Sequence, residues 1–353
     1  MNDHIAMKGG GYYSLATLGA KHVIDGATPL VLEAIQRMPE RRDPFVMSDM
    51  GTADGGTSLD LVTKVIEAVK QRWPKRDIAI VHTDQPRNDF NALVANVHRR
   101  PPVEGVYLLQ SATSFYRQIL PATTLDLGFS ATAMHWLSHK PCEISDHVQA
   151  VGAKGAELEA FARQGNADWR TILTHRAAEL KSGGRLVLVN FCRDEHGRYL
   201  GHTGGVNMFD MFNLIWRAFV ASGAISEAEY RAMTLPQYYK TLAEFTGPLR
   251  DPDDPLHQAG LRLEQAETRV VPCPYAAEFR RHGDAAGFAR AYIPTMRSWT
   301  ESTFFGALDA GRPLAERQAI IERFYGDYEA RVRAEPAQHG MGYVHAYLTI
   351  AKA

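Results

Sequence analysis

Two features that follow apolar runs have the chemistry to bind a nucleotide-like ligand. Residues 51–56, Gly-Thr-Ala-Asp-Gly-Gly, follow the run 45–50, and glycines there let the backbone approach a ligand closely. Asp84 follows the run 78–83, where a fixed carboxylate can accept hydrogen bonds from both hydroxyls of a ribose. The alternatives are an ordinary turn at 51–56, since the stretch departs from the GxGxxG pattern, and a cap by Asp84 of a helix over 88–96.

Composition favours a small-molecule role for these residues. The 353-residue chain carries 39 Lys and Arg against 40 Asp and Glu and has no basic run, which argues against nucleic acid or an anionic membrane as a partner. Cys142, Cys192 and Cys273 are widely spaced and odd in number, so neither a disulfide scaffold nor a zinc ribbon is expected. No stretch approaches the roughly 18 apolar residues of a spanning helix, and a cytoplasmic protein is expected.

Alternating strands and helices must position these residues. A strand at 45–50, a glycine turn, a helix over 57–73 and a second strand form a βαβ order. This order predicts a parallel sheet with the ligand at the carboxyl ends of its strands. The first four strands are expected at 45–50, 78–83, 124–130 and 185–190, and 267–271 and 343–350 are also strand-like.

The chain divides into four expected parts. Residues 1–44 form an N-terminal segment that closes the active site, and 45–203 form the cofactor-binding core. Residues 204–300 change to helices rich in aromatic side chains and broken by prolines, which predicts a cap over the substrate. Residues 301–353 are expected to supply a helix and an edge strand that returns to the core.

Several short motifs resemble those of one enzyme family. Residues 111–116 read Ser-Ala-Thr-Ser-Phe-Tyr and 134–138 read Met-His-Trp-Leu-Ser, with an apolar run at 125–129 between them. Their order and spacing are similar to those of the SABATH family, plant-type methyltransferases named for salicylate, benzoate and theobromine enzymes. The stretches 7–14 and 83–91 are also similar to family motifs. The resemblance implies an α/β fold, a Rossmann-like class I methyltransferase sheet with a mostly helical cap, and S-adenosylmethionine as cofactor.

The resemblance also implies which residues bind the cofactor. Asp84 is expected on the ribose, and Ser114 and Phe115 at the adenine end, although a buried aromatic is the alternative for Phe115. Thr52 and Thr57 replace a Cys and an Asn of the family, and Leu15 replaces a Tyr. The implied cofactor-binding residues are Ser14, Asp49, Gly51, Thr52, Thr57, Asp84, Gln85, Ser114, Phe115 and Ser130.

Matching the family's substrate positions gives a second set. Lys8, His22, His135 and Trp136 are expected to position the substrate, and both histidines stand where the family has other residues. A neutral histidine can donate one hydrogen bond and accept one, so the pair suits a polar acid, although a lone histidine is more often structural. The implied substrate-binding residues are Lys8, His22, Thr132, His135, Trp136, Ile215, Trp216, Tyr238, Met296 and Trp299.

Packing of the cap is the alternative role for Trp299. Residues 231–234 replace the oxygen ligands of the metal site found in some family members, so no metal is expected.

The implied reaction needs no acid–base residue. A carboxylate is already ionised at neutral pH, so methyl transfer to it depends on positioning and desolvation, and the sequence has no Ser/His/Asp or HxxE arrangement. We therefore expect a carboxyl O-methyltransferase that forms the methyl ester of a small, aromatic acid, and a homodimer. The alternatives are N-methylation of a heteroaromatic ring and a catalytically silent member that binds a small acid. An NAD-dependent reductase is disfavoured because the glycine fingerprint is imperfect.

Overall fold

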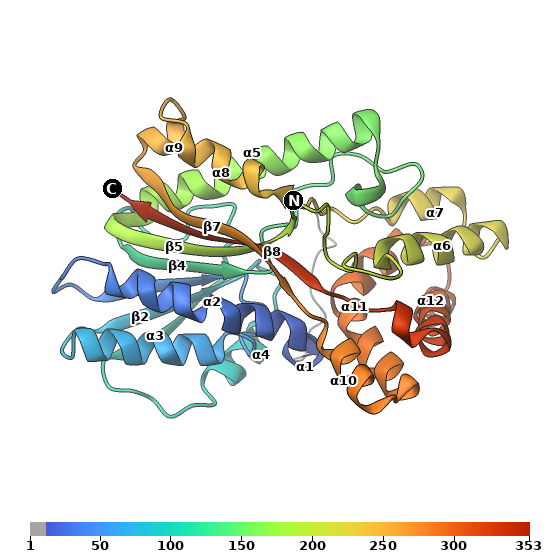
Figure 1. Cartoon of the computed structure of the whole chain (residues 1–353), viewed down its shortest axis with the longest axis horizontal. Helices are drawn as coiled ribbons and strands as arrows, with labels where there is room; N and C mark the ends of the chain where they lie inside the picture. The colour runs from blue at the N-terminus through green and yellow to red at the C-terminus, as the bar shows by residue number, and fades with distance from the viewer. Residues whose placement is uncertain (1–11) are drawn as a thin grey trace.

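The computed structural model describes residues 12–353 and has one mixed sheet between two helical layers, with further helices beyond one end of the sheet (Figure 1). The strands are β1 (Phe45–Met50), β2 (Ile78–Thr83), β3 (Val106–Ser111), β4 (Leu125–Ala131), β5 (Leu180–Arg193), β6 (Lys240–Thr241), β7 (Leu261–Val271) and β8 (Tyr343–Lys352). Within the described residues they form an eight-stranded sheet in the order β3-β2-β1-β4-β5-β8-β7, with β6 paired to β5. The first five strands in this order are parallel, and β8 is antiparallel to both its neighbours.

Helices cover both faces of the sheet and one end of it. The helices are α1 (Tyr12–Ala16), α2 (Leu18–Gln36), α3 (Leu59–Arg72), α4 (Phe90–Val97), α5 (Gly155–Glu179), α6 (Met208–Ala221), α7 (Glu227–Ala232), α8 (Leu242–Arg250), α9 (Pro255–Gln258), α10 (Pro274–His282), α11 (Ala285–Ala307) and α12 (Leu314–Ala334). In Figure 1, α2 and α3 lie on one face, α5, α8 and α9 on the other, and α6, α7 and α10 to α12 form the cap. The expected α/β sheet with a helical cap is therefore present.

The βαβ unit predicted at the start of the core is confirmed. β1 and β2 have the predicted bounds and pair in parallel, since each is an apolar run buried over nearly its whole length. In α3 the buried residues Leu61, Val62, Val65 and Val69 share one face, and Asp60 in the first turn with Arg72 in the last complements the helix dipole. This unit places the carboxyl ends of β1 and β2 side by side.

Two strands differ from the sequence prediction. β3 was not predicted, because it alternates between half-buried and exposed residues and ends in Gln110 and Ser111, as an edge strand does. The strand expected at 185–190 is longer in the structure, where β5 begins at Leu180 and contains the pair Gly183-Gly184. Gly183, with φ of 77°, forms part of an irregularity where the register with β4 shifts.

The cap is discontinuous in sequence, which corrects the expected parts. Its first stretch is 208–232 and its second is 274–334, so α12 belongs to the cap and packs on α11 and α6. Between them, 242–271 returns to the sheet as α8, α9 and β7. The expected division into a cap at 204–300 and a C-terminal part at 301–353 therefore places β7 and α12 wrongly. β8 is also not an edge strand, since it lies between β5 and β7.

Candidate active site

The loop between β1 and α3 brings its backbone to the carboxyl ends of the strands. Gly51 has a φ of 76°, and a Cβ there would lie 2.5 Å from the Cβ of Ala133, so this position requires glycine. The buried Asp49 braces the loop, because its Oδ2 accepts hydrogen bonds from the hydroxyls of Thr52, at 3.0 Å, and Ser58, at 2.7 Å. Two of the expected cofactor residues, Asp49 and Thr52, therefore contact each other across the loop.

Asp84 stands at the end of β2 and contacts the same loop. Its Oδ2 accepts the backbone N–H of Ala53 and its Oδ1 that of Gln85, both at 2.7 Å. Each carboxylate oxygen has a further lone pair, so both keep capacity for a ligand hydroxyl. The alternative role of a helix cap is wrong, because Asp89 caps α4 by accepting the N–H of Ala92.

The surroundings of Asp84 shift its proton affinity. Burial raises the pKa of Asp84 to about 6, the two backbone donors at Ala53 and Gln85 oppose that shift, and the nearby Asp49 adds to it. Donors on a ligand would favour the ionised form. Cofactor binding and the charge of Asp84 are therefore coupled.

Ser14 in α1 is hydrogen-bonded to Asp54 in the glycine loop. The backbone N–H of Ser14 donates to Asp54 Oδ2 at 3.0 Å, and its hydroxyl donates to Oδ1. Asn96 in α4 donates to the carbonyl of Asp54 at 2.8 Å, and Thr57 is buried beside this corner. Ser14, an expected cofactor residue, thus lies against the loop, as a segment closing over the pocket would.

The Ser-Phe-Tyr turn after β3 approaches the loop from the other side. Phe115 is buried, and its ring edge lies 3.6 Å from the point where a Gly51 Cβ would stand. Ser114 is also buried, and Ser130 braces the end of β1 by donating to the carbonyl of Met50 at 2.7 Å. These residues lie around the glycine loop at the carboxyl end of the sheet.

A buried ion pair that sequence reasoning missed holds this turn. Arg176 and Glu179 on α5 are fully buried and pair at 2.6 Å. Arg176 donates to the carbonyls of Phe115, at 3.0 Å, and Arg117, at 2.8 Å, while Glu179 accepts the N–H groups of Ile119 and Leu120. Their spacing of three residues was the sequence signal, but such pairs are common on exposed helix faces.

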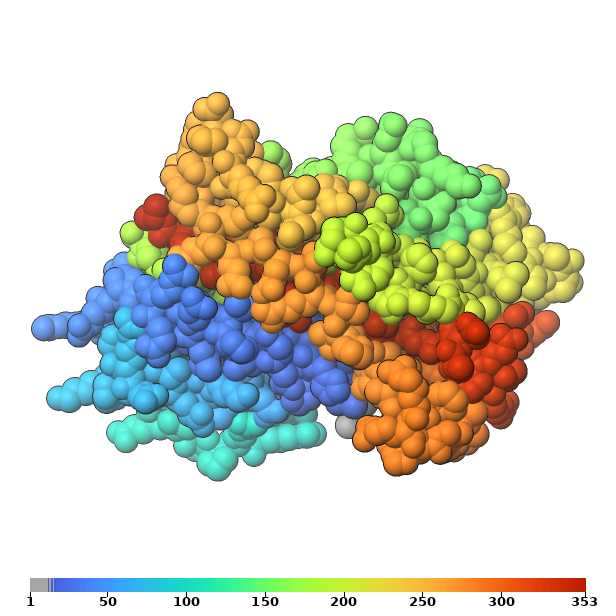
Figure 2. All heavy atoms as spheres, viewed as in Figure 1, coloured from blue at the N-terminus to red at the C-terminus, as the bar shows by residue number. Residues whose placement is uncertain are grey.

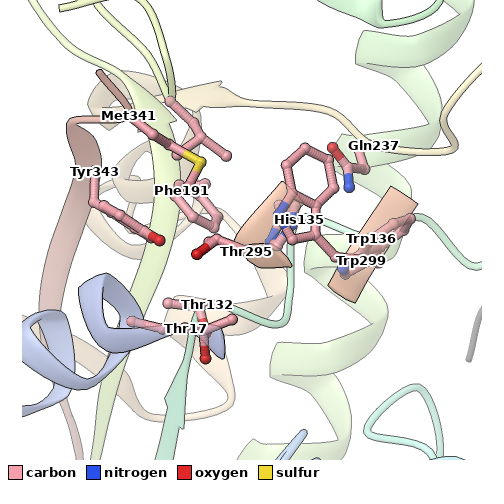
Figure 3. A pocket seen from close by; sticks show the side chains of 12 residues that line it. Thr17, Thr132, His135, Trp136, Phe191, Gln237, Thr295, Trp299, Met341 and Tyr343 are labelled. Carbon is pink, nitrogen blue, oxygen red and sulfur yellow. The ribbon is translucent and has the colours of Figure 1, made fainter. Parts of the chain in front are cut away.

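A cavity lies between the sheet and the cap. The cavity is small, about 30 Å³, and Figure 3 shows its side chains arriving from α2, β5, β8, α11 and the segments after β4 and α7. It lies at the carboxyl ends of β4 and β5, next to the glycine loop. The lining residues are Thr17, Ala20, Thr132, His135, Trp136, Phe191, Leu200, Gln237, Thr295, Trp299, Met341 and Tyr343.

His135 and Gln237 bring unpaired polar atoms to this cavity. The segments around them run side by side, because Trp136 and Gln237 form an antiparallel bridge. His135 Nδ1 and Gln237 Nε2 have no hydrogen-bond partner among residues 12–353, although both side chains are buried. Burial lowers the pKa of His135 to about 3, so its ring is neutral. Buried polar groups without partners indicate a place for a polar ligand.

Four of the expected substrate residues line this cavity and five others lie elsewhere. Thr132, His135, Trp136 and Trp299 line it, whereas His22 is exposed on the outer face of α2. Tyr238 donates its hydroxyl to Glu244 at 2.9 Å and does not line the cavity. Ile215, Trp216 and Met296 lie in the core of the cap, where Trp216 stacks on Phe324. Lys8 lies outside the described residues.

Helical phase explains these corrections. On α11 the cavity receives Thr295 and Trp299, one turn apart, while the intervening Met296 points to the core. Near the start of α2 it receives Thr17 and Ala20 in place of His22. A shift of one residue turns a helical side chain by about 100°, which a motif match does not resolve.

Several lining residues carried no sequence signal. Phe191, Leu200 and Met341 are ordinary apolar residues, and Gln237 is the neighbour of the expected Tyr238. Tyr343 comes from β8, which begins 150 residues after the end of β5. Its ring packs over Gly19, where an added Cβ would lie 2.1 Å from the tyrosine Cε2. Glycine in α2 therefore makes room for the ring that lines the cavity.

Thr234, in the stretch 231–234 where no metal site is expected, uses its hydroxyl in hydrogen bonds within the protein. The hydroxyl of Thr234 accepts the N–H of Ile144 at 2.9 Å and donates to the carbonyl of Arg231 at 2.8 Å. Within residues 12–353, no group of three or more His, Cys, Asp and Glu side chains is placed to hold an ion. The absence of metal dependence stays a prediction.

Comparison with known proteins assigns the class of protein that this sheet and site define. The chain belongs to the SAM dependent carboxyl methyltransferases, whose family model matches residues 2–253. Among characterised relatives, it is 25% identical to O-methyltransferase acrG of Aspergillus aculeatus, over 97% of this chain and 96% of the relative. It is 26% identical to salicylate carboxymethyltransferase of Clarkia breweri, over 80% of each chain. The SABATH resemblance is therefore confirmed.

A solved structure supports the fold. A loganic acid methyltransferase crystallised with SAH is similar over 98% of both chains, with a TM-score of 0.77 and 19% identity. The chain is thus a SAM-dependent enzyme that methylates carboxylic acids on oxygen, with the Rossmann-like class I fold. Within the described residues, no helix is both long and apolar enough to cross a bilayer.

The space around the glycine loop fits the cofactor. Asp84 can take the ribose hydroxyls, and a Cβ at Gly51 would narrow the approach between Ala133 and Phe115. The cavity beside it is the candidate acceptor site. This division into two adjoining sites agrees with a reaction between two bound molecules.

Proposed function

We propose that the acceptor is a small planar acid that carries a hydrogen-bonding group in addition to its carboxylate. The observation behind this proposal is the unpaired Nε2 of Gln237, a buried donor in the wall of the cavity. Aromatic side chains surround the same space, since the His135 ring lies 5.6 Å from that of Trp136 and 4.8 Å from that of Phe191. Flat walls with a few fixed polar groups favour a flat, polar ligand.

Catalysis in this proposal consists of binding and orientation. When bound, S-adenosylmethionine supplies an electrophilic methyl group that an ionised carboxylate can accept without a general base. Trp136 and Phe191 hold the ring plane of the acid, and Gln237 fixes its second polar group. Neutral His135 adds one donor and excludes water. Their task is to keep one carboxylate oxygen at the cofactor side of the cavity.

The counter-charge for the carboxylate is part of the proposal. None of the described lining residues is Lys or Arg. We assign this task to Lys8, which lies outside the described residues, because its sequence motif resembles the family's N-terminal motif. A cavity whose described wall is neutral also favours the second candidate, N-methylation of an uncharged heteroaromatic ring.

Product identity separates these candidates. Purified enzyme is incubated with labelled cofactor and matched pairs: benzoate and 2-hydroxybenzoate, an aliphatic acid and its hydroxy acid, and a xanthine. We expect methyl esters by mass spectrometry, with about 10-fold higher kcat/KM for the hydroxylated acid, the effect of about 1.4 kcal/mol from one donor that the unsubstituted acid leaves unpaired. Only N-methylated products would replace the ester proposal with its rival.

Variants test whether Gln237 is the donor that causes the preference for the hydroxylated acid. Gln237→Leu should remove the preference for the hydroxylated acid while the affinity for SAH stays unchanged. Gln110→Leu, at an exposed position on β3, is the matched control and should change neither. Lys8→Met should raise KM for acids and leave an uncharged acceptor unaffected. An unchanged preference in Gln237→Leu would remove this residue from the acceptor site.

The compartment and the oligomeric state of the protein are also proposals. We infer a reducing compartment such as the cytoplasm, because Cys142, Cys192 and Cys273 are all free. We also propose a homodimer, with the exposed Tyr107 and Leu109 on β3 as the apolar surface that supports it. Sedimentation at several concentrations tests the assembly, and a monomer at all of them would exclude it.

A further inference from the structure

A large cavity lies on the far side of α3 from the acceptor site. Its volume is about 400 Å³, within the range of small-molecule pockets. The floor is formed by β2 and β3, one wall by α3, and the roof by the chain that follows α4. The lining residues are Leu59, Val62, Thr63, Ile66, Glu67, Lys70, His82, Val97, His98, Arg100, Pro101, Pro102, Val103, Val106 and Leu108.

The short crossover between β2 and β3 produces this cavity. α4 has only eight residues, and the chain that follows contains Pro101 and Pro102, which cannot continue a helix. A longer helix could cover Val106 and Leu108, which line the cavity on this face of the sheet. Figure 2 shows α2, α3 and the chain after α4 as blue, cyan and teal layers down this side of the molecule.

His82 lies at the inner end of the cavity, and one of its ring nitrogens makes no hydrogen bond with the described residues. The side chain is 1% exposed, and its Nδ1 lies 3.5 Å from Asp49 Oδ2 and from Thr52 Oγ1. Nε2, on the opposite side of the ring, has no hydrogen-bond partner among the described residues. When Nδ1 carries the ring hydrogen toward the Asp49 carboxylate, Nε2 is left as an acceptor.

Two of the charged side chains around the cavity are already engaged, whereas the exposed Glu67 has no partner among the described residues. Arg100 lies 2.5 Å from Asp60, and Lys70 donates to the carbonyl of Arg76 at 3.1 Å. Most of the remaining wall is aliphatic, including Val62, Ile66 and Val106. An anionic ligand would therefore find no free cation among these side chains, and an exposed carboxylate such as Glu67 adds little binding energy for a cation. An apolar molecule with one hydroxyl satisfies both the wall and His82.

We propose that this cavity is a second ligand site, separate from the cofactor and acceptor sites, which binds a small neutral phenol or apolar alcohol whose hydroxyl donates to His82 Nε2. No chemical step is involved. Only the side chain of His82 would separate the ligand from the glycine loop, because the other ring nitrogen of His82 faces Asp49 and Thr52. The proposal does not depend on which acid the enzyme methylates.

Fluorine NMR with matched probes tests the site. The probes are 4-fluorophenol, which has the hydroxyl, and 4-fluorotoluene, which has nearly the same shape without it. With the full chain saturated by SAH, we expect the phenol to bind at least five-fold more tightly than the toluene. Equal affinity of both probes would contradict the assigned role of His82.

Two adjacent positions on β3 supply the variant and its control. Val106 lines the cavity, whereas Tyr107 points to the other face and is 56% exposed. Val106→Trp should fill the cavity and lower phenol affinity at least ten-fold, and Tyr107→Trp should leave it unchanged. SAH affinity of each variant checks folding. Retained binding in folded Val106→Trp, or equal loss in both variants, would overturn the proposal.

Discussion

At the scale of single residues, Asp84 combines two tasks in one carboxylate. It holds the glycine loop through Ala53 and keeps lone pairs for the ribose. Asp84→Ala should therefore weaken SAH binding by about 2–4 kcal/mol, at about 1–2 kcal/mol for each of two lost hydrogen bonds. Calorimetry measures the affinity, and circular dichroism controls for folding. An unchanged affinity in a folded variant would exclude Asp84 from the cofactor site.

The raised pKa of Asp84 gives a second residue-scale prediction. The ionised form accepts the ribose hydroxyls, so SAH affinity should be full above about pH 6 and fall, by up to about ten-fold per pH unit, below it. Calorimetry from pH 5 to 8 measures this fall, and in Asp84→Ala it should disappear. An affinity that is flat down to pH 5 in the wild type contradicts the coupling.

The contribution of Asp84 to the free energy of unfolding has the opposite pH dependence from its contribution to SAH affinity. Its folded-state pKa lies above the ordinary value of 3.8, so its contribution is fully present below that value and is lost as the pH rises through about 6.

Residue identities in the site could be predicted only where backbone geometry fixes them. Asp84 and Trp136 follow strands at fixed points, and the motif match placed both at the site. His22, Met296 and Tyr238 were misplaced because each lies one or two residues from a position that does face the cavity. Side-chain direction along a helix changes too quickly for a motif of unequal length to fix it.

At the scale of elements, the close contact between α2 and β8 shapes the acceptor cavity. Gly19→Ala would place a methyl group against the buried ring of Tyr343, which itself packs on the rings of Phe191 and His345. We expect a loss of about 1–3 kcal/mol in the free energy of unfolding and a higher KM for the acid. Gly26→Ala in the same helix has only ordinary contact at 3.5 Å and is the matched control.

Denaturant unfolding and steady-state kinetics measure both effects. If Gly19→Ala and Gly26→Ala behave alike, the packing of Tyr343 on α2 does not set the shape of the cavity.

Element prediction succeeded for central strands and failed at the edges. β1 and β2 are buried on both faces, so each reads as a continuous apolar run with a clear end. β3 and the first half of β7 lie at the two edges of the sheet, where nearly all residues are half-buried or exposed. Their pairing depends on partners distant in sequence, which local patterns do not reveal.

At the scale of the whole molecule, the enzyme should work without a metal ion. Thr234 uses its hydroxyl within the protein, and Arg231 adds a positive charge to the same stretch. Dialysis against EDTA should leave the rate of ester formation unchanged, measured with and without added Mg²⁺. A loss of activity that Mg²⁺ restores would place a metal in the reaction and revise the alignment near 231–238.

The place of β8 in the sheet has a consequence for how the chain folds during synthesis. β5 pairs with β8 along seven residues, from Arg185 with Ala351 to Phe191 with His345, so the partner of a central strand is made more than 150 residues later. Until then, the apolar edge of β5 is open to other nascent chains. A chaperone that shields this edge should increase the yield of native enzyme, slow translation should decrease it, and β5 is where aggregates would begin.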